Sequence, residues 1–223
     1  MLASRLVFAV LPQRCAVCRR LGDGVCTGCL AALVRVAPPL CERCGSPGPW
    51  PVRRCAECAG RRIAFARARS AVVYEGRVRD FVTAWKEHGR RDLAEIAADL
   101  VCHCVPPPPV AEMTFVPADH DRRLERGHAP PQALAAALAE RWSLPLAELL
   151  VRTRRLRRQR GLSLAERRRN VAGAFVADGN VPRSVCLVDD VYTTGATANA
   201  CSSALRRRGA REVHVVSLAR AVR

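Results

Sequence analysis

Twelve consecutive residues near the C-terminus carry polar groups in an order that suits a phosphorylated ribose. They read Cys186-Leu187-Val188-Asp189-Asp190-Val191-Tyr192-Thr193-Thr194-Gly195-Ala196-Thr197. The two aspartates accept hydrogen bonds only and suit the 2′- and 3′-hydroxyls of a ribose. The threonine hydroxyls can donate to a phosphate, and Gly195 lets the backbone approach its oxygens closely. The segment therefore predicts a site that holds a ribose 5-phosphate by both ends.

The elements expected around this segment complete the phosphate site. The apolar stretch 185–188 predicts a buried strand, and a helix is expected over about 196–208. Open α/β sheets bind ligands at the carboxyl ends of their strands, where this strand delivers its aspartates. The helix N-terminus then offers N–H groups and the positive end of its dipole to a phosphate. The alternative is an ordinary strand end with two solvated aspartates and a threonine-capped helix. The match at every polar position favours the ligand site.

Eight of the twelve cysteines form four CxxC pairs. The pairs are Cys15/Cys18, Cys26/Cys29, Cys41/Cys44 and Cys55/Cys58. One CxxC turn points two sulfurs at the same position, so two turns complete a tetrahedral S4 site. The pattern predicts two structural zinc ions with sequential pairing, the first two turns together and the last two together. Interleaved pairing and iron–sulfur ligation remain alternatives, because thiolates also bind iron.

The remaining cysteines do not suggest a third metal site. Cys186 falls in the apolar strand and Cys201 in the following helix, where both are expected to be core residues. Residues 102–104, Cys-His-Cys, end a predicted helix just before four prolines. A metal site there is the alternative, and a frayed helix end is favoured.

No stretch approaches the roughly 18 apolar residues that cross a bilayer. The run 2–11 is short and is interrupted by Arg5, so it resembles an amphipathic helix more than a secretory signal. We therefore expect a cytoplasmic protein with no transmembrane segment. Disulfides rarely persist in that compartment, which also favours metal for the CxxC pairs.

The formal net charge of +17 indicates a polyanionic partner, and nucleic acid is the commonest one. Lys86 is the only lysine among the 37 basic residues, so the charge comes almost entirely from arginine. Codon bias of a GC-rich genome is the alternative explanation of that ratio. Arginines concentrate in the range 152–169, which predicts a loop over a site.

A change of composition after residue 60 divides the chain into a cysteine module, 1–60, and a larger domain, 61–223. In the larger domain, strands are expected over 71–74, 113–116, 146–151, 185–188 and 213–218. Helices are expected over 79–86, 92–102, 131–141 and 196–208, the second with a capping box made by Asp92 and Glu95. Strands alternating with helices predict an α/β domain with a largely parallel sheet.

The whole chain resembles the ComF family of competence-associated proteins. The segment 186–197 looks like the phosphoribosyl-pyrophosphate signature of type I phosphoribosyltransferases, and four CxxC pairs precede it. The match continues at 74–76, at Lys86 with Gly89, at 126–127 and from 159 to 175. One departure lies after Gly127, where family members usually continue with Phe-Asn-Gln. Here the residues are His128-Ala129-Pro130-Pro131-Gln132.

The resemblance implies a type I phosphoribosyltransferase-like sheet behind a double zinc ribbon, and it implies a ligand, phosphoribosyl pyrophosphate with Mg²⁺. Asp189 and Asp190 would hold the ribose, and 193–197 would grip the 5-phosphate. The turn 117–119 would be the pyrophosphate loop, and the arginine-rich segment would close over the leaving group. Neither His120 nor His128 is assigned as a general base.

Three hypotheses about function follow. In the first, which we favour, the protein binds phosphoribosyl pyrophosphate and acts with single-stranded DNA in DNA uptake during natural transformation. In the second it is a free-standing phosphoribosyltransferase of nucleotide salvage or metabolism, with an unknown acceptor. In the third the zinc module docks a helicase-like or uptake-channel partner. Aromatic residues are few and scattered, which argues against base-specific readout.

Overall fold

The computed structural model describes residues 14–22, 24–118, 127–153, 166, 170–171 and 173–222. Its centre is a four-stranded sheet in the order β1-β6-β5-β2, and every neighbouring pair is parallel. The strands are β1 (Arg67–Val73), β2 (Glu112–Phe115), β5 (Ser184–Tyr192) and β6 (Glu212–Arg220). The predicted α/β class with a largely parallel sheet is confirmed.

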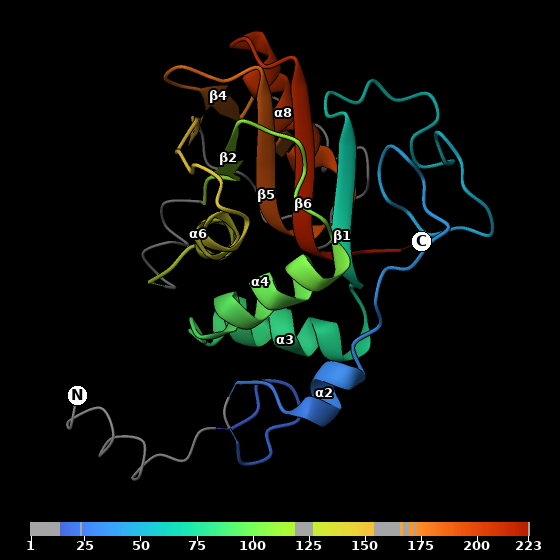
Figure 1. Ribbon diagram of the computed structural model, residues 1–223, viewed down its shortest axis with the longest axis vertical. Coiled ribbons are helices and arrows are strands. Elements are labelled where there is room, and N and C mark those ends of the chain that lie inside the picture. The colour runs from blue at the N-terminus through green and yellow to red at the C-terminus, as the bar shows by residue number, and fades with distance from the viewer. Residues whose placement is uncertain are drawn as a thin grey trace.

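Helices cover both faces of this sheet (Figure 1). On one face α3 (Gly76–Glu87), α4 (Leu93–Cys104) and α6 (Pro130–Trp142) pack on Cys186 and Val188 of β5. On the other face α8 (Ala196–Arg207) packs on Val185 and Leu187. Side chains alternate along a strand, so one nearly continuous apolar strand supplies both cores.

The two halves of the cysteine module attach at different places. The first half, with α2 (Thr27–Ala31), lies against α3 and α4. The second half lies beside β1 at the edge of the sheet, where Ala68 N donates to Arg43 O at 2.8 Å (Figure 1). The proposed boundary at residue 60 thus falls in a segment that is in contact with the larger domain.

One prediction about local structure is only partly right, and another is wrong. The strand expected over 146–151 makes only a single bridge to the sheet at Leu146, and its end forms β3 (Leu150–Arg152). That segment leaves the sheet because it pairs antiparallel with β4 (Phe175–Ala177), a strand for which the sequence carries no clear pattern. The capping box at Asp92 is also absent, because its carboxylate is held by Arg90 at 2.6 Å and makes no cap bond.

Among the described helices, none combines the length and the apolar character needed to cross a bilayer. The helix proposed over 2–11 lies outside the described residues, as do most of the arginines between 152 and 169.

Candidate functional site

The predicted phosphate loop joins β5 to α8, as expected, but β5 is longer than predicted. It continues to Tyr192, so Asp189 and Asp190 lie inside the strand rather than beyond it. The turn 193–195 follows, and α8 begins at Ala196. Thr194 is buried, and its Oγ1 accepts a hydrogen bond from Ala196 N at 3.2 Å. The threonines named from the sequence therefore lie at the N-terminus of α8, and the two aspartates lie in β5, a few residues before the turn.

Gly195 is required by the shape of this turn. Its φ of +68° lies in the left-handed region, and a Cβ added there would overlap the hydroxyl of Tyr192. Tyr192 is itself buried, with its ring edge-on to Phe65. The glycine therefore lets the loop close directly over a fixed aromatic ring.

The two aspartates have different partners. Asp190 is on the face of β5 covered by α3, and Lys86 of α3 places Nζ 2.7 Å from its Oδ1. Asp189 Oδ1 accepts from the backbone N–H of Asp190 at 2.9 Å. Burial, followed by the neighbouring charge of Asp190, raises the pKa of Asp189 to about 8, although Lys86 opposes the shift. The site therefore combines one ion-paired carboxylate with one that readily holds a proton.

A buried arginine links this loop to the second half of the cysteine module. Arg220, at the end of β6, is 0% exposed and donates to Cys44 O at 2.6 Å and to Glu57 Oε2 at 2.8 Å. Its guanidinium also lies 4.8 Å from the ring centroid of Tyr192. A second link comes from Arg61, which donates to Glu57 O of the module at 3.1 Å and to Thr194 O of the loop at 3.0 Å. The second half of the cysteine module is therefore connected to the phosphate loop through Arg220 and Arg61.

The eight CxxC cysteines form two separate tetrads, each with all four sulfurs within 4.8 Å of one another. They are Cys15, Cys18, Cys26 and Cys29 in the first, and Cys41, Cys44, Cys55 and Cys58 in the second. The sequential pairing is confirmed. Zn–S bonds of about 2.3 Å give tetrahedral edges of about 3.8 Å. Sulfur separations of 3.8 Å for Cys18–Cys26 and 3.5 Å for Cys44–Cys55 fit that geometry.

Backbone N–H groups point at the first sulfur of each tetrad. Cys26 N lies 3.4 Å from Cys15 Sγ, and Cys55 N lies 3.3 Å from Cys41 Sγ. Burial alone would raise the pKa of Cys15, but these and neighbouring backbone donors outweigh it and lower the pKa to about 6. The thiolate of the first cysteine in each tetrad is thus stabilised, whereas burial raises the pKa of Cys29 and of Cys44.

Relatives of known description match nearly the whole chain. Competence protein F of Haemophilus influenzae is 30% identical, over 93% of this chain and 97% of that protein. The chain belongs to the ComF family. Another relative is the DNA utilization protein YhgH of Escherichia coli O6:H1, 29% identical over 94% of this chain and 98% of its own length.

The double zinc ribbon of this ComF protein is also recognised by itself, since the family model "Double zinc ribbon domain" matches residues 6–60. With the two tetrads, it identifies the cysteines as structural zinc sites. Part of the chain is similar to a glutamine phosphoribosylpyrophosphate amidotransferase from B. subtilis complexed with ADP and GMP. That similarity has a TM-score of 0.38 and 26% identity, and covers 57% of this chain and 26% of the other.

Three residues that contact the segment 189–195 were not in the predicted ligand set. They are Lys86, which contacts Asp190, Arg61, which contacts Thr194, and Arg220, which contacts Tyr192. Lys86 carried a signal, because it is the only lysine in the chain. The two arginines carried none, since they are two among 36. His128 Nε2 lies 2.8 Å from Trp85 O. His120 lies outside the described residues.

Proposed function

We propose that this ComF protein binds phosphoribosyl pyrophosphate at the loop between β5 and α8, and acts with single-stranded DNA in DNA uptake or use. The observation that carries the ligand assignment is the loop itself. Thr194 and Gly195 form a tight turn at the N-terminus of α8, a few residues after the Asp189–Asp190 pair. The carboxylates can accept hydrogen bonds from the hydroxyls of a ligand, and the turn can hold a phosphate. Few ligands other than a ribose phosphate carry both groups so close together.

Each group of the loop has a distinct role in this proposal. The segment 193–197 holds the 5-phosphate, and Asp189 and Asp190 accept from the ribose hydroxyls. Lys86 already lies beside Asp190 and has further N–H donors for the pyrophosphate. Carboxylate and ligand oxygens suit Mg²⁺, which would be held here together with the ligand and would neutralise charge on the pyrophosphate.

The DNA role rests on relatives and on charge. The matched proteins are described as a competence protein and a DNA utilization protein. A net charge of +17 favours contact with a nucleic-acid backbone. Docking of a helicase-like or uptake-channel partner would use the ribbons, where Leu21 and Trp50 are both 66% exposed.

We propose ligand binding, and not catalytic turnover, as the property to test first. The described residues around Asp190 include Lys86 as an ion-pair partner, and His128 is engaged with Trp85 O. A phosphoribosyl transfer reaction needs an acceptor and a group that takes its proton. The sequence and the described site identify neither, so pyrophosphate release is tested after binding.

Calorimetric titration of the zinc-loaded protein with phosphoribosyl pyrophosphate, with and without Mg²⁺, tests this proposal. We expect Mg²⁺-dependent binding that Asp189→Asn/Asp190→Asn weakens at least about 100-fold, because charged hydrogen bonds are worth about 1.5–3 kcal/mol each. The matched control is Asp80→Asn/Asp178→Asn, which removes the same charge from exposed positions and should bind like the wild type. Absence of binding to the folded, zinc-loaded wild type would refute the ligand assignment.

A further inference from the structure

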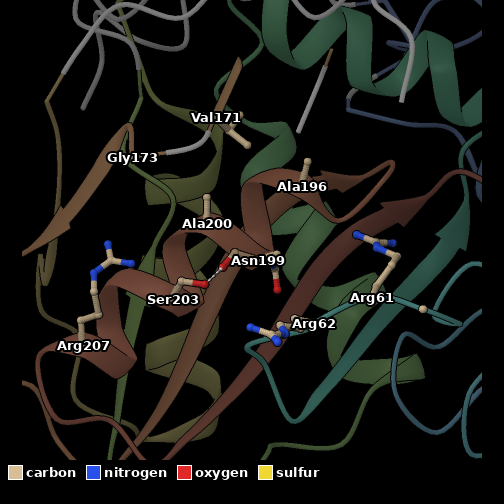
Figure 2. A pocket seen from close by; sticks show the side chains of 10 residues that line it. Arg61, Arg62, Val171, Gly173, Ala196, Asn199, Ala200, Ser203 and Arg207 are labelled. Carbon is tan, nitrogen blue, oxygen red and sulfur yellow. Dashed lines mark hydrogen bonds between the residues drawn. The ribbon is translucent and has the colours of Figure 1, made fainter. Parts of the chain in front are cut away.

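A cavity of about 440 Å³ lies beside α8, next to the phosphate loop (Figure 2). One face of α8 forms its floor, with Val171 and Gly173 along one side and Arg61 and Arg62 along the opposite side. The floor residues are Ala196, Asn199, Ala200, Ser203 and Arg207. Of the loop residues assigned to the phosphoribosyl ligand, only Ala196 lines this cavity. The cavity therefore has room for a second ligand.

The charge of the cavity favours an anion. Three of its described lining residues are arginines, and none is a carboxylate. Arg62 and Arg207 are exposed, and neither side chain has a hydrogen bond or an ion pair with the part of the chain that the structure describes. Two guanidinium groups without counter-ions at one hollow attract phosphate, which they can bind through paired N–H groups.

Asn199 adds a neutral donor whose orientation is fixed. Its Oδ1 accepts from the backbone N–H of Ala64 at 2.7 Å, so its amide NH₂ is the group left to donate to a ligand. Ser203 Oγ is already used as a donor to Asn199 O at 2.8 Å. The small side chains of Ala196 and Ala200 leave space above the helix.

A second hollow of about 520 Å³ adjoins the first and shares Arg207 with it. Its other described lining residues are Gly179, Asn180, Val181 and Arg208. A single phosphate would occupy one hollow only. Two hollows that share one arginine suit a chain that carries phosphates at regular intervals.

We propose that these two hollows bind the phosphodiester backbone of single-stranded nucleic acid, with Arg62 and Arg207 contacting successive phosphates. This inference rests on the DNA role proposed above and names its surface. None of the described lining residues is aromatic, so stacking contributes nothing here and binding is insensitive to base sequence.

The test is fluorescence anisotropy of a labelled oligothymidylate titrated with the full-length zinc-loaded protein over a range of salt concentrations. Arg62→Ala/Arg207→Ala should lower affinity about tenfold or more, and should flatten the slope of log K against log salt by about 1.4, or about 0.7 for each lost contact. Arg20→Ala/Arg53→Ala removes the same charge from exposed ribbon positions and is the matched control. Arg61 is left unchanged because it also contacts Thr194 O.

Ser203→Glu is a second variant, which adds a carboxylate to the floor of the cavity without removing an arginine. It should also weaken DNA binding, and both variants should keep wild-type affinity for phosphoribosyl pyrophosphate and wild-type zinc content.

Wild-type DNA affinity in both variants would overturn the proposed surface, and so would an equal loss of affinity in the control variant. Absence of DNA binding by the wild-type protein would overturn the DNA role itself. If inorganic phosphate bound at the cavity and the oligonucleotide did not, the cavity would be a site for free phosphate only, and the proposal would be overturned.

Discussion

Asp189 holds a proton more readily than an aspartate in water does. Burial and the charge of Asp190 raise its pKa to about 8, and Lys86 contacts Asp190 rather than Asp189. A carboxylate in that position destabilises the unliganded protein at neutral pH, because the ionised form is poorly solvated. A ligand that donates hydroxyls to Asp189 removes this cost. Asp189 therefore lowers the stability of the unliganded protein and favours the protein with its ligand bound.

Asp189→Asn should accordingly stabilise the unliganded protein while it weakens ligand binding. Between about pH 4 and pH 8 the unfolded chain releases this proton and the folded chain keeps it, so the stability of the wild type falls as pH rises. Asparagine does not titrate. The melting temperature of the variant should exceed that of the wild type by about 3–8 °C at pH 8, and by much less at pH 5. Thermal melts at both values measure this, and Asp178→Asn, an exposed carboxylate, should show no such difference.

Gly195→Ala tests the closure of the loop over Tyr192. Gly179 has nearly the same backbone angle, with φ of +70° against +68°, but an added Cβ there meets nothing within 4 Å. Gly179→Ala therefore measures backbone strain alone, at about 1–2 kcal/mol. Gly195→Ala should cost about 1–3 kcal/mol more, because it overlaps Tyr192, and should lose ligand binding. Denaturant unfolding and calorimetry of the two variants compare them, and equal costs would show that Tyr192 yields.

At the scale of elements, β6 connects the second ribbon to the loop through one side chain. Arg220 contacts Cys44 O, Glu57 and the ring of Tyr192. Arg220→Met leaves Glu57 and the Cys44 carbonyl without this partner, and removal of one member of a buried ion pair costs about 3–5 kcal/mol. We expect weaker ligand binding and faster release of one zinc ion to a chromogenic chelator. Arg77→Met is the control at the first ribbon, where Arg77 Nη1 approaches Cys29 Sγ at 4.0 Å, and should leave ligand binding unchanged.

The sequence predicted those elements whose signal is local. The apolar run of β5, the hydroxyl-rich turn and the CxxC spacing each lie within a few residues, so the sheet core, the loop and both tetrads were found. Contacts between distant segments were not found. β4 is only three residues long and exists through pairing with β3, and Arg220 meets Glu57 across 163 positions in sequence. Such contacts depend on the assembled fold, which neither period nor composition encodes.

At the scale of the whole molecule, each zinc tetrad belongs to a different core. Cys15 and Cys29 pack with α3, α4 and α6 on one face of the sheet. Cys41, Cys44 and Cys58 pack with α8 on the other. Gly24 and Gly45 also approach the larger domain closely, at the Ile96 side chain and the Ala68 carbonyl. The ribbons therefore complete both cores, and zinc binding and folding of the sheet should be coupled.

Removal of zinc should destabilise the whole chain. Structural zinc contributes about 10–16 kcal/mol of apparent free energy to small zinc modules, and here part of that energy reaches the sheet through shared cores. Trp85 of α3 is fully buried, whereas Trp50 is exposed in the second ribbon. In a Trp50→Phe/Trp142→Phe variant, Trp85 is the single tryptophan and reports on α3 alone. Chelation should shift its emission to the red and lower the melting temperature by more than about 10 °C, and restored zinc should reverse both changes. If Trp85 emission stayed blue after complete zinc removal, the ribbons would be independent of the sheet, and the boundary at residue 60 would separate two autonomous domains.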